Sequence, residues 1–113
     1  MSCPPHPPDI VVKFHLTART AEGSARVVRS GYRPIYGIRP DYWSSAHHEF
    51  VNAEVAKTDE PCEAEVWLLA PEAHPHTMWI GRTIQVAEGP RIVGVAEVQQ
   101  ILNPLLERPA PKA

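Results

Sequence analysis

The chain has 113 residues, and its 11 Lys and Arg residues nearly balance its 13 Asp and Glu residues, for a formal net charge of −2. This length suits one domain with one modest core. The balanced charge excludes the general basic field of a non-specific nucleic-acid coat. The two cysteines, Cys3 and Cys62, are too few for a disulfide scaffold and favour a reducing compartment.

The first residues, MSCPPHPPD, resemble no targeting signal. They have neither the positive n-region nor the apolar h-region of a secretory signal. No apolar run approaches the roughly 20 residues needed to cross a bilayer. We therefore expect a cytoplasmic protein without a membrane partner.

Proline is dense at both ends of the chain, in CPPHPP at 3–8 and in NPLLERPAPKA at 103–113. Successive prolines remove backbone donors and favour extended polyproline conformations. We expect a disordered Pro-rich head over residues 1–8, a folded body over 9–102 and a disordered Pro-rich tail over 103–113. The alternative is that these ends are Pro-rich docking peptides.

The body is expected to consist of β-strands. The segment 9–18 places an apolar residue at every second position, which is typical of a half-buried strand. The expected strands are 9–18, 32–38, 49–56, 62–70, 82–87 and 91–101. Polar, Gly-containing or Pro-containing turns separate them, and Glu88-Gly89-Pro90 joins the last two as a hairpin.

Six short strands in a body of this size predict an all-β fold, either a small closed barrel or a sandwich. A barrel would remove the exposed edges that a small open sheet presents. No helix of useful length is expected, although residues 96–102 could end in a short turn.

Motifs for catalysis or cofactor binding are absent from the sequence. It has no GxxxxGK[ST] or GxGxxG phosphate-binding loop, and no GxSxG, CxxC or HExxH. We therefore expect a protein that is not an enzyme, needs no cofactor and binds no nucleotide.

Two histidine pairs are the candidates for a metal site. They are His47 with His48 in AHHEF, and His74 with His76 in AHPHT. Neutral imidazole is a common metal ligand, but neither pair has a specific ligand spacing. Surface or loop histidines are the favoured interpretation, and a small metal-binding protein is the alternative.

Two further motifs stand at opposite ends of the body. One is the turn Gly31-Tyr32-Arg33-Pro34, followed by Tyr36 and Arg39, and the other is the hairpin from Glu88 to Gly94. In their order and spacing, over residues 9–102, they resemble the C-terminal β-barrel, the third domain, of translation elongation factor Tu. The resemblance implies a small closed six-stranded antiparallel β-barrel as a stand-alone domain.

The resemblance also implies a binding role rather than GTP hydrolysis. In that family the nucleotide belongs to another domain, and the third domain contacts the T-stem of aminoacyl-tRNA, an exchange factor and the neighbouring domains. Glu88 matches a family residue of the tRNA contact region. Ile35 stands where the family has a Gln that contacts the T-stem, and Ser44 or Ser45 aligns loosely with a family Thr.

The favoured function is a binding module for a protein partner linked to translation. Aromatic and Arg residues are enriched at binding hot spots, so Trp43, Trp67, Trp79 and Tyr42 are candidates for an exposed surface. The candidate binding residues are Tyr32, Arg33, Tyr36, Arg39, Trp43, Trp79, Arg82, Glu88 and Arg91.

Binding of tRNA or another RNA is the alternative. Because phosphate contacts carry the affinity for nucleic acids, this function needs basic side chains to gather on one side of the barrel. The side chains in question are Lys13, Arg33, Arg39, Arg82 and Arg91.

Overall fold

The fold is described by a computed structural model that covers residues 6–108. Within this range the strands are β1 (Ile10–Leu16), β2 (Val27–Arg29), β3 (Ile35–Arg39), β4 (Tyr42–Phe50), β5 (Val55–Lys57), β6 (Cys62–Leu68), β7 (Thr83–Glu88) and β8 (Arg91–Ile101). Two short 3-10 helices, η1 (Pro71–Ala73) and η2 (Pro104–Leu106), complete the regular structure. None of the helices in the described range is long and apolar enough to span a membrane.

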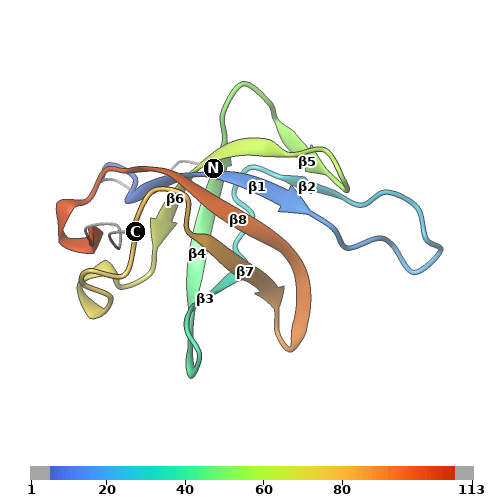
Figure 1. The fold of residues 1–113 in the computed structure, drawn as a ribbon. Helices are drawn as coiled ribbons and strands as arrows, with labels where there is room; N and C mark the ends of the chain where they lie inside the picture. Colours follow the sequence, from blue (N-terminus) through green and yellow to red (C-terminus); the bar gives the residue numbers. More distant parts are fainter. Residues whose placement is uncertain (1–5, 109–113) are drawn as a thin grey trace.

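Six of the strands form a closed barrel in the order β1-β6-β4-β3-β7-β8 (Figure 1). All neighbouring pairs are antiparallel. β1 closes the barrel because it pairs with β6 on one side and with β8 on the other, so that Ile10 lies opposite both Val66 and Ile101. The expected all-β fold is confirmed, and of the two expected architectures the chain adopts the barrel.

The alternation in the first segment is confirmed by burial. The inward residues of β1 lie in the hydrophobic core, whereas Lys13 between them is exposed. The hairpin is also confirmed: Glu88 pairs with Arg91, and Gly89 takes a positive φ of 58° in the turn between them. A side chain at Gly89 would be strained there, which explains a glycine at this position.

The expected strand over 49–56 is wrong. β4 begins at Tyr42, directly after a tight turn from β3, and ends at Phe50. The chain then turns at Asn52, whose positive φ of 62° is incompatible with an extended strand. The period of β4 was hidden in the sequence because polar residues, Ser44 and His48, occupy buried positions.

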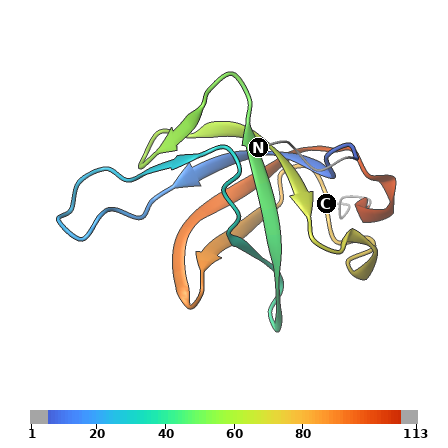
Figure 2. The ribbon, with the colours of Figure 1, turned by 180° about the vertical axis from the view of Figure 1, so that it is seen from behind.

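A second, two-stranded sheet lies outside the barrel order. It pairs β2 with β5. The sequence predicts a loop where β2 lies, and β5 overlaps the end of the predicted strand 49–56. Figure 2 shows that this ribbon and the loop before β2 project away from the barrel. Thr58 links the two strands to the body, since its hydroxyl donates to the carbonyl of Ala18 at 2.6 Å.

Residues 103–108, which we expected to lie in the tail, pack against the barrel. Leu106 is fully buried in the core, and Asn103 caps η2 by accepting from the backbone N–H of Leu105 at 3.1 Å. Asn103 also donates to Asp9 at 2.9 Å. The disorder expected for residues 1–5 and 109–113 falls outside the described residues.

Candidate binding surface

The aromatic stretch from Gly31 to Arg39 divides between the interior and the outer face of the barrel. Gly31 has a positive φ of 93° and turns the chain into β3. Along β3 the side chain of Tyr36 is fully buried, whereas Ile35 is partly exposed on the other face. Tyr36, one of the candidate binding residues, is therefore a core residue.

Tyr36 and His48 form a polar pair inside the barrel. The Tyr36 hydroxyl lies 2.7 Å from Nε2 of His48, and both side chains are fully buried. Burial raises the pKa of Tyr36 and lowers the pKa of His48 to about 3. Both groups are therefore neutral at physiological pH, and one hydrogen bond joins the hydroxyl to the ring nitrogen.

Glu88 is engaged by groups of its own chain. Its carboxylate pairs with the guanidinium of Arg26 and accepts from the Tyr32 hydroxyl at 2.6 Å. Burial would raise the pKa of Glu88, but the hydrogen bonds from Arg26 and Tyr32 outweigh burial and lower it. Tyr32 and Glu88, both candidate binding residues, therefore connect the segment before β3 to the end of β7.

Trp43 is the most prominent candidate on the outer face. It pairs with Gly37 across β3 and β4, and 38% of its surface is exposed. The benzo edge of its indole lies over Gly37, since a Cβ added there would meet the ring at 3.1–3.2 Å. The absent side chain of Gly37 therefore lets Trp43 lie against β3.

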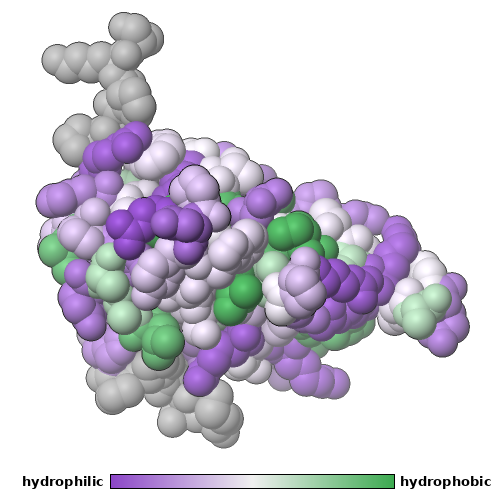
Figure 3. All heavy atoms as spheres, turned by 90° about the horizontal axis from the view of Figure 1, so that it is seen from below, coloured by the Kyte–Doolittle hydropathy of each residue, from purple (hydrophilic) through white to green (hydrophobic). Residues whose placement is uncertain are grey.

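A hollow opens on each side of Trp43. One, of about 380 Å³, is lined by apolar residues that include Ile35, Pro90 and Ile92. The other, of about 340 Å³, is more polar and includes Arg39 and Arg82. Figure 3, which views the molecule from the side of the β3–β4 and β7–β8 turns, shows apolar patches set among polar surface.

Arg82 joins Trp79 to this surface. The Arg82 guanidinium donates to the carbonyls of Thr77 and Ile38, and it lies 5.1 Å from the centre of the Trp79 ring. Arg108 stacks on the same ring at 4.2 Å. The Trp79 indole is consequently only half-exposed, and Arg82 is anchored at the edge of the hollow beside Trp43.

The basic side chains that RNA binding would need do not gather on one side. Arg39 and Arg82 line one hollow, whereas Arg91 approaches the carbonyl of Arg19 beyond the β7–β8 hairpin. Arg33 lies beside His47 on another part of the outer face. Lys13 stands between two acidic neighbours, Glu63 and Glu97, on the adjoining strands.

The four histidines lie in different surroundings. The expectation of surface or loop positions is wrong for His47 and His48, which are buried in β4, whereas His76 is exposed in a turn. His47 lies on the outer face of β4 and His48 lies inside the barrel. His74 is buried after η1 against the ring of Tyr42, and burial, followed by the charge of Arg39, lowers its pKa. Across residues 6–108, no three His, Cys, Asp or Glu side chains come together as metal ligands would.

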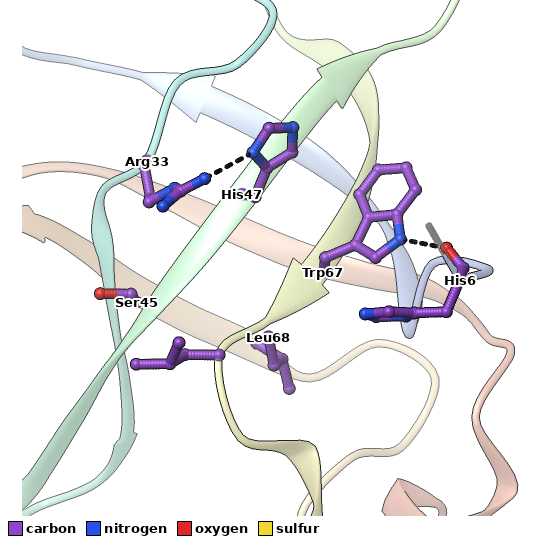
Figure 4. A pocket seen from close by; sticks show the side chains of 7 residues that line it. His6, Arg33, Ser45, His47, Trp67 and Leu68 are labelled. Atoms are coloured by element: carbon purple, nitrogen blue, oxygen red, sulfur yellow. Dashed lines mark hydrogen bonds between the residues drawn. The ribbon is translucent and has the colours of Figure 1, made fainter. Parts of the chain in front are cut away.

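A separate hollow of about 320 Å³ lies on the outer face of β4 and β6 (Figure 4). Arg33 and His47 line one side, with Nη2 of Arg33 at 3.5 Å from Nδ1 of His47. Trp67 and His6 lie on the other side (Figure 4), and Leu69 is also part of the lining. The expectation that Trp67 lies on an exposed surface is wrong, because only 5% of its surface is exposed. Sequence patterns could not show the hollow, which residues far apart in the chain create.

Comparisons with known proteins leave the family of the chain open. No protein-family model matches it, and no curated protein matches it. The established description is a small closed six-stranded antiparallel barrel.

Proposed function

We propose that this chain is a non-catalytic binding module that engages a protein partner through the surface around Trp43. The observation that carries the proposal is the position of Trp43, exposed between an apolar hollow and an Arg-lined hollow. Trp and Arg are the residue types that dominate protein-binding hot spots. A partner with apolar side chains for the first hollow and acidic groups facing Arg39 and Arg82 would complement this surface.

The resemblance to the third domain of elongation factor Tu supports a binding role and points to the same area. Ile35 pairs with Ser45 on one side and with Ala87, next to Glu88, on the other. By the resemblance, Ile35 and Glu88 stand at positions of the family's T-stem contact region, and Ser44 or Ser45 aligns loosely with a third. Here Ile35 offers no hydrogen bond, and the carboxylate of Glu88 is taken by Arg26 and Tyr32.

An apolar surface therefore occupies the place where the family contacts RNA, and this favours a protein partner over RNA. Ile92, at the edge of the same hollow, is 45% exposed. The link to translation rests on the resemblance alone. RNA binding is further disfavoured because the five basic side chains are dispersed, and phosphate binding gains affinity from adjacent charges.

The test is a pull-down from an extract of the source cells with tagged full-length chain at low and moderate salt. Trp43→Ser is compared with Leu102→Ser, because both side chains are 38% exposed and only Trp43 lines the two hollows. We expect one stoichiometric protein that survives moderate salt with the native chain and with Leu102→Ser. Trp43→Ser should weaken its binding about thirtyfold, which corresponds to about 2 kcal/mol.

Two results would contradict the proposal. One is a partner that binds Trp43→Ser as tightly as the native chain. The other is co-purification of RNA in place of protein, with steep loss of that RNA as salt rises, because counterion release makes phosphate binding sensitive to salt.

A further inference from the structure

Trp67 points outward from the barrel and is nevertheless covered. Its neighbours in β6, Val66 and Leu68, point into the core, so the alternation of the strand places Trp67 on the outer face. Only 5% of its surface is exposed. An outward indole of this size needs covering groups from elsewhere in the chain.

The groups seen to contact the Trp67 indole are the ring of His47 and the backbone of His6, the residue before Pro7 and Pro8. The His47 ring meets Trp67 edge-on, with the ring centres 5.6 Å apart and the planes at 88°. The indole N–H of Trp67 donates to the backbone carbonyl of His6 at 2.6 Å (Figure 4). The polar edge of the Trp67 indole is therefore engaged by the residue that directly precedes the prolines of the same chain.

This contact uses the chemistry that a Pro-rich segment can offer. Pro7 and Pro8 have no backbone N–H, so the segment presents carbonyl acceptors and apolar rings. An exposed Trp with a free indole N–H is the complementary partner, and aromatic-lined grooves recognise polyproline segments in this way. Asp9 fixes the end of the segment, because its backbone N–H donates to Val66 and its carboxylate accepts from the backbone of Leu68, both at 2.8 Å.

The groove continues beyond the covered indole. The hollow of about 320 Å³ beside Trp67 is lined also by Arg33, Ser45 and Leu69, and Leu69 is 74% exposed. The His6 segment thus covers the Trp67 side and leaves an apolar and basic floor open next to it. A longer extended segment would fit along both parts.

We propose that the outer face of β4 and β6 is a docking groove for proline-rich extended segments. In this chain the carbonyl of His6, directly before Pro7 and Pro8, accepts the indole N–H of Trp67. A proline-rich segment of a partner protein displaces His6 and takes this N–H. The groove is distinct from the Trp43 surface, and the inference does not rest on the function proposed above.

The experiment follows the three indole N–H signals of ¹⁵N-labelled full-length chain by NMR, assigned with single Trp→Phe variants. The probe is the acetylated and amidated peptide Pro-Pro-His-Pro-Pro, which copies residues 4–8. It is titrated into the native chain and into the double variant Pro7→Gly/Pro8→Gly, whose own segment is loosened. We expect the Trp67 signal to shift saturably while those of Trp43 and Trp79 stay in place.

The peptide should bind the loosened variant at least about twofold more tightly than the native chain, since a tethered competitor acts at a millimolar effective concentration. A Gly-Gly-His-Gly-Gly peptide should leave the Trp67 signal in place. An unmoved Trp67 signal in both proteins, equal affinities for the two proteins, or equal effects of the two peptides would each overturn the proposal.

Trp67→Phe removes the indole N–H but keeps an aromatic ring at this position. The methyl signals of Leu69 then report whether the peptide binds. The peptide should shift these signals in the native chain and not in the variant. Undiminished binding by Trp67→Phe would overturn the role of the indole N–H. If the variant does not fold, the comparison of the native chain with the loosened variant decides alone.

Discussion

At the scale of single residues, two glycines face very different neighbours. A Cβ on Gly37 would touch the exposed ring of Trp43, which can swing aside. A Cβ on Gly94 would lie 2.3 Å from the carbonyl oxygen of His15, which is held in the β1–β8 ladder. The same change from glycine to alanine therefore probes a movable side chain at one site and a fixed backbone at the other.

We expect Gly37→Ala to change the free energy of unfolding by less than about 1 kcal/mol and to raise the exposure of Trp43. Gly94→Ala should lower the free energy of unfolding by about 2 kcal/mol or more, because overpacking against backbone cannot relax. Urea unfolding measures both changes, and fluorescence in a Trp67→Phe/Trp79→Phe background reports on Trp43. A Gly37→Ala variant with larger destabilisation than Gly94→Ala would contradict this account.

The buried His48 predicts an acid-sensitive barrel. Its pKa is about 3 in the folded chain and about 6.5 when unfolded, so on acidification the unfolded state takes up the proton first. The free energy of unfolding should therefore fall between about pH 6.5 and pH 3, by up to about 1.4 kcal/mol per pH unit from this group. The lowered pKa of His74 adds a further loss of stability as the pH falls below the ordinary pKa of histidine. The lowered pKa of Glu88 adds another loss of stability at lower pH, below the ordinary pKa of glutamate.

Urea unfolding at pH 7.0, 6.0 and 5.0 measures this slope, and Tyr36→Phe/His48→Leu provides the control. The double variant replaces both partners of the buried hydrogen bond with apolar groups, which is tolerated better than removal of one partner. Its stability should fall less steeply with acid than that of the native chain. Identical slopes would show that His48 does not carry the effect.

At the scale of elements, η2 extends the barrel beyond its last strand. Leu106 enters the core, and the chain beyond it runs beside Met78, whose backbone N–H donates to the carbonyl of Leu106 at 2.8 Å. Leu105, its neighbour, is 41% exposed. Within residues 103–108, the Pro-rich end therefore contributes the side chain of Leu106 to the core.

Leu106→Ala should destabilise the chain by about 2–4 kcal/mol, because it removes buried methyl groups and leaves a cavity. Leu105→Ala is the matched control, and its effect should stay within about 0.5 kcal/mol, as for other surface changes. Thermal and urea unfolding measure both. Equal effects of the two variants would show that η2 does not dock on the barrel in solution.

At the scale of the whole molecule, closure of the barrel joins the two ends of the body. Ile10 in β1 pairs with Ile101 in β8, so the last ladder links residues far apart in the sequence. Proteins dominated by such distant pairings fold more slowly than those built from local contacts, because loop closure costs entropy before the contacts form.

We therefore expect refolding from urea in the millisecond-to-second range, measured by stopped-flow fluorescence. Val12→Ala in β1 should lower the free energy of unfolding, because it removes buried methyl groups from the strand that closes the barrel. Refolding in microseconds would contradict a fold limited by closure. Surface substitution at Gln99, which is exposed on β8, serves as the control and should leave the rate unchanged.

The amino-acid sequence by itself determined the elements whose signal is local. Alternation placed Ile10, Phe14 and Leu16 of β1 inside, and the Glu88-Gly89-Pro90 turn joined the last two strands. These features depend on a period of two residues and on backbone conformations that glycine permits. They sufficed for the all-β class.

Only the tertiary structure decided which residues from distant parts of the chain lie next to one another. β4 stayed hidden because its inward His48 is polar, and the partner that makes this acceptable, Tyr36, comes from another strand. Likewise, Trp43 is exposed between two hollows, whereas Trp67 is covered by His6, although both side chains point outward. The register of distant strands sets these contacts, and no local pattern encodes it.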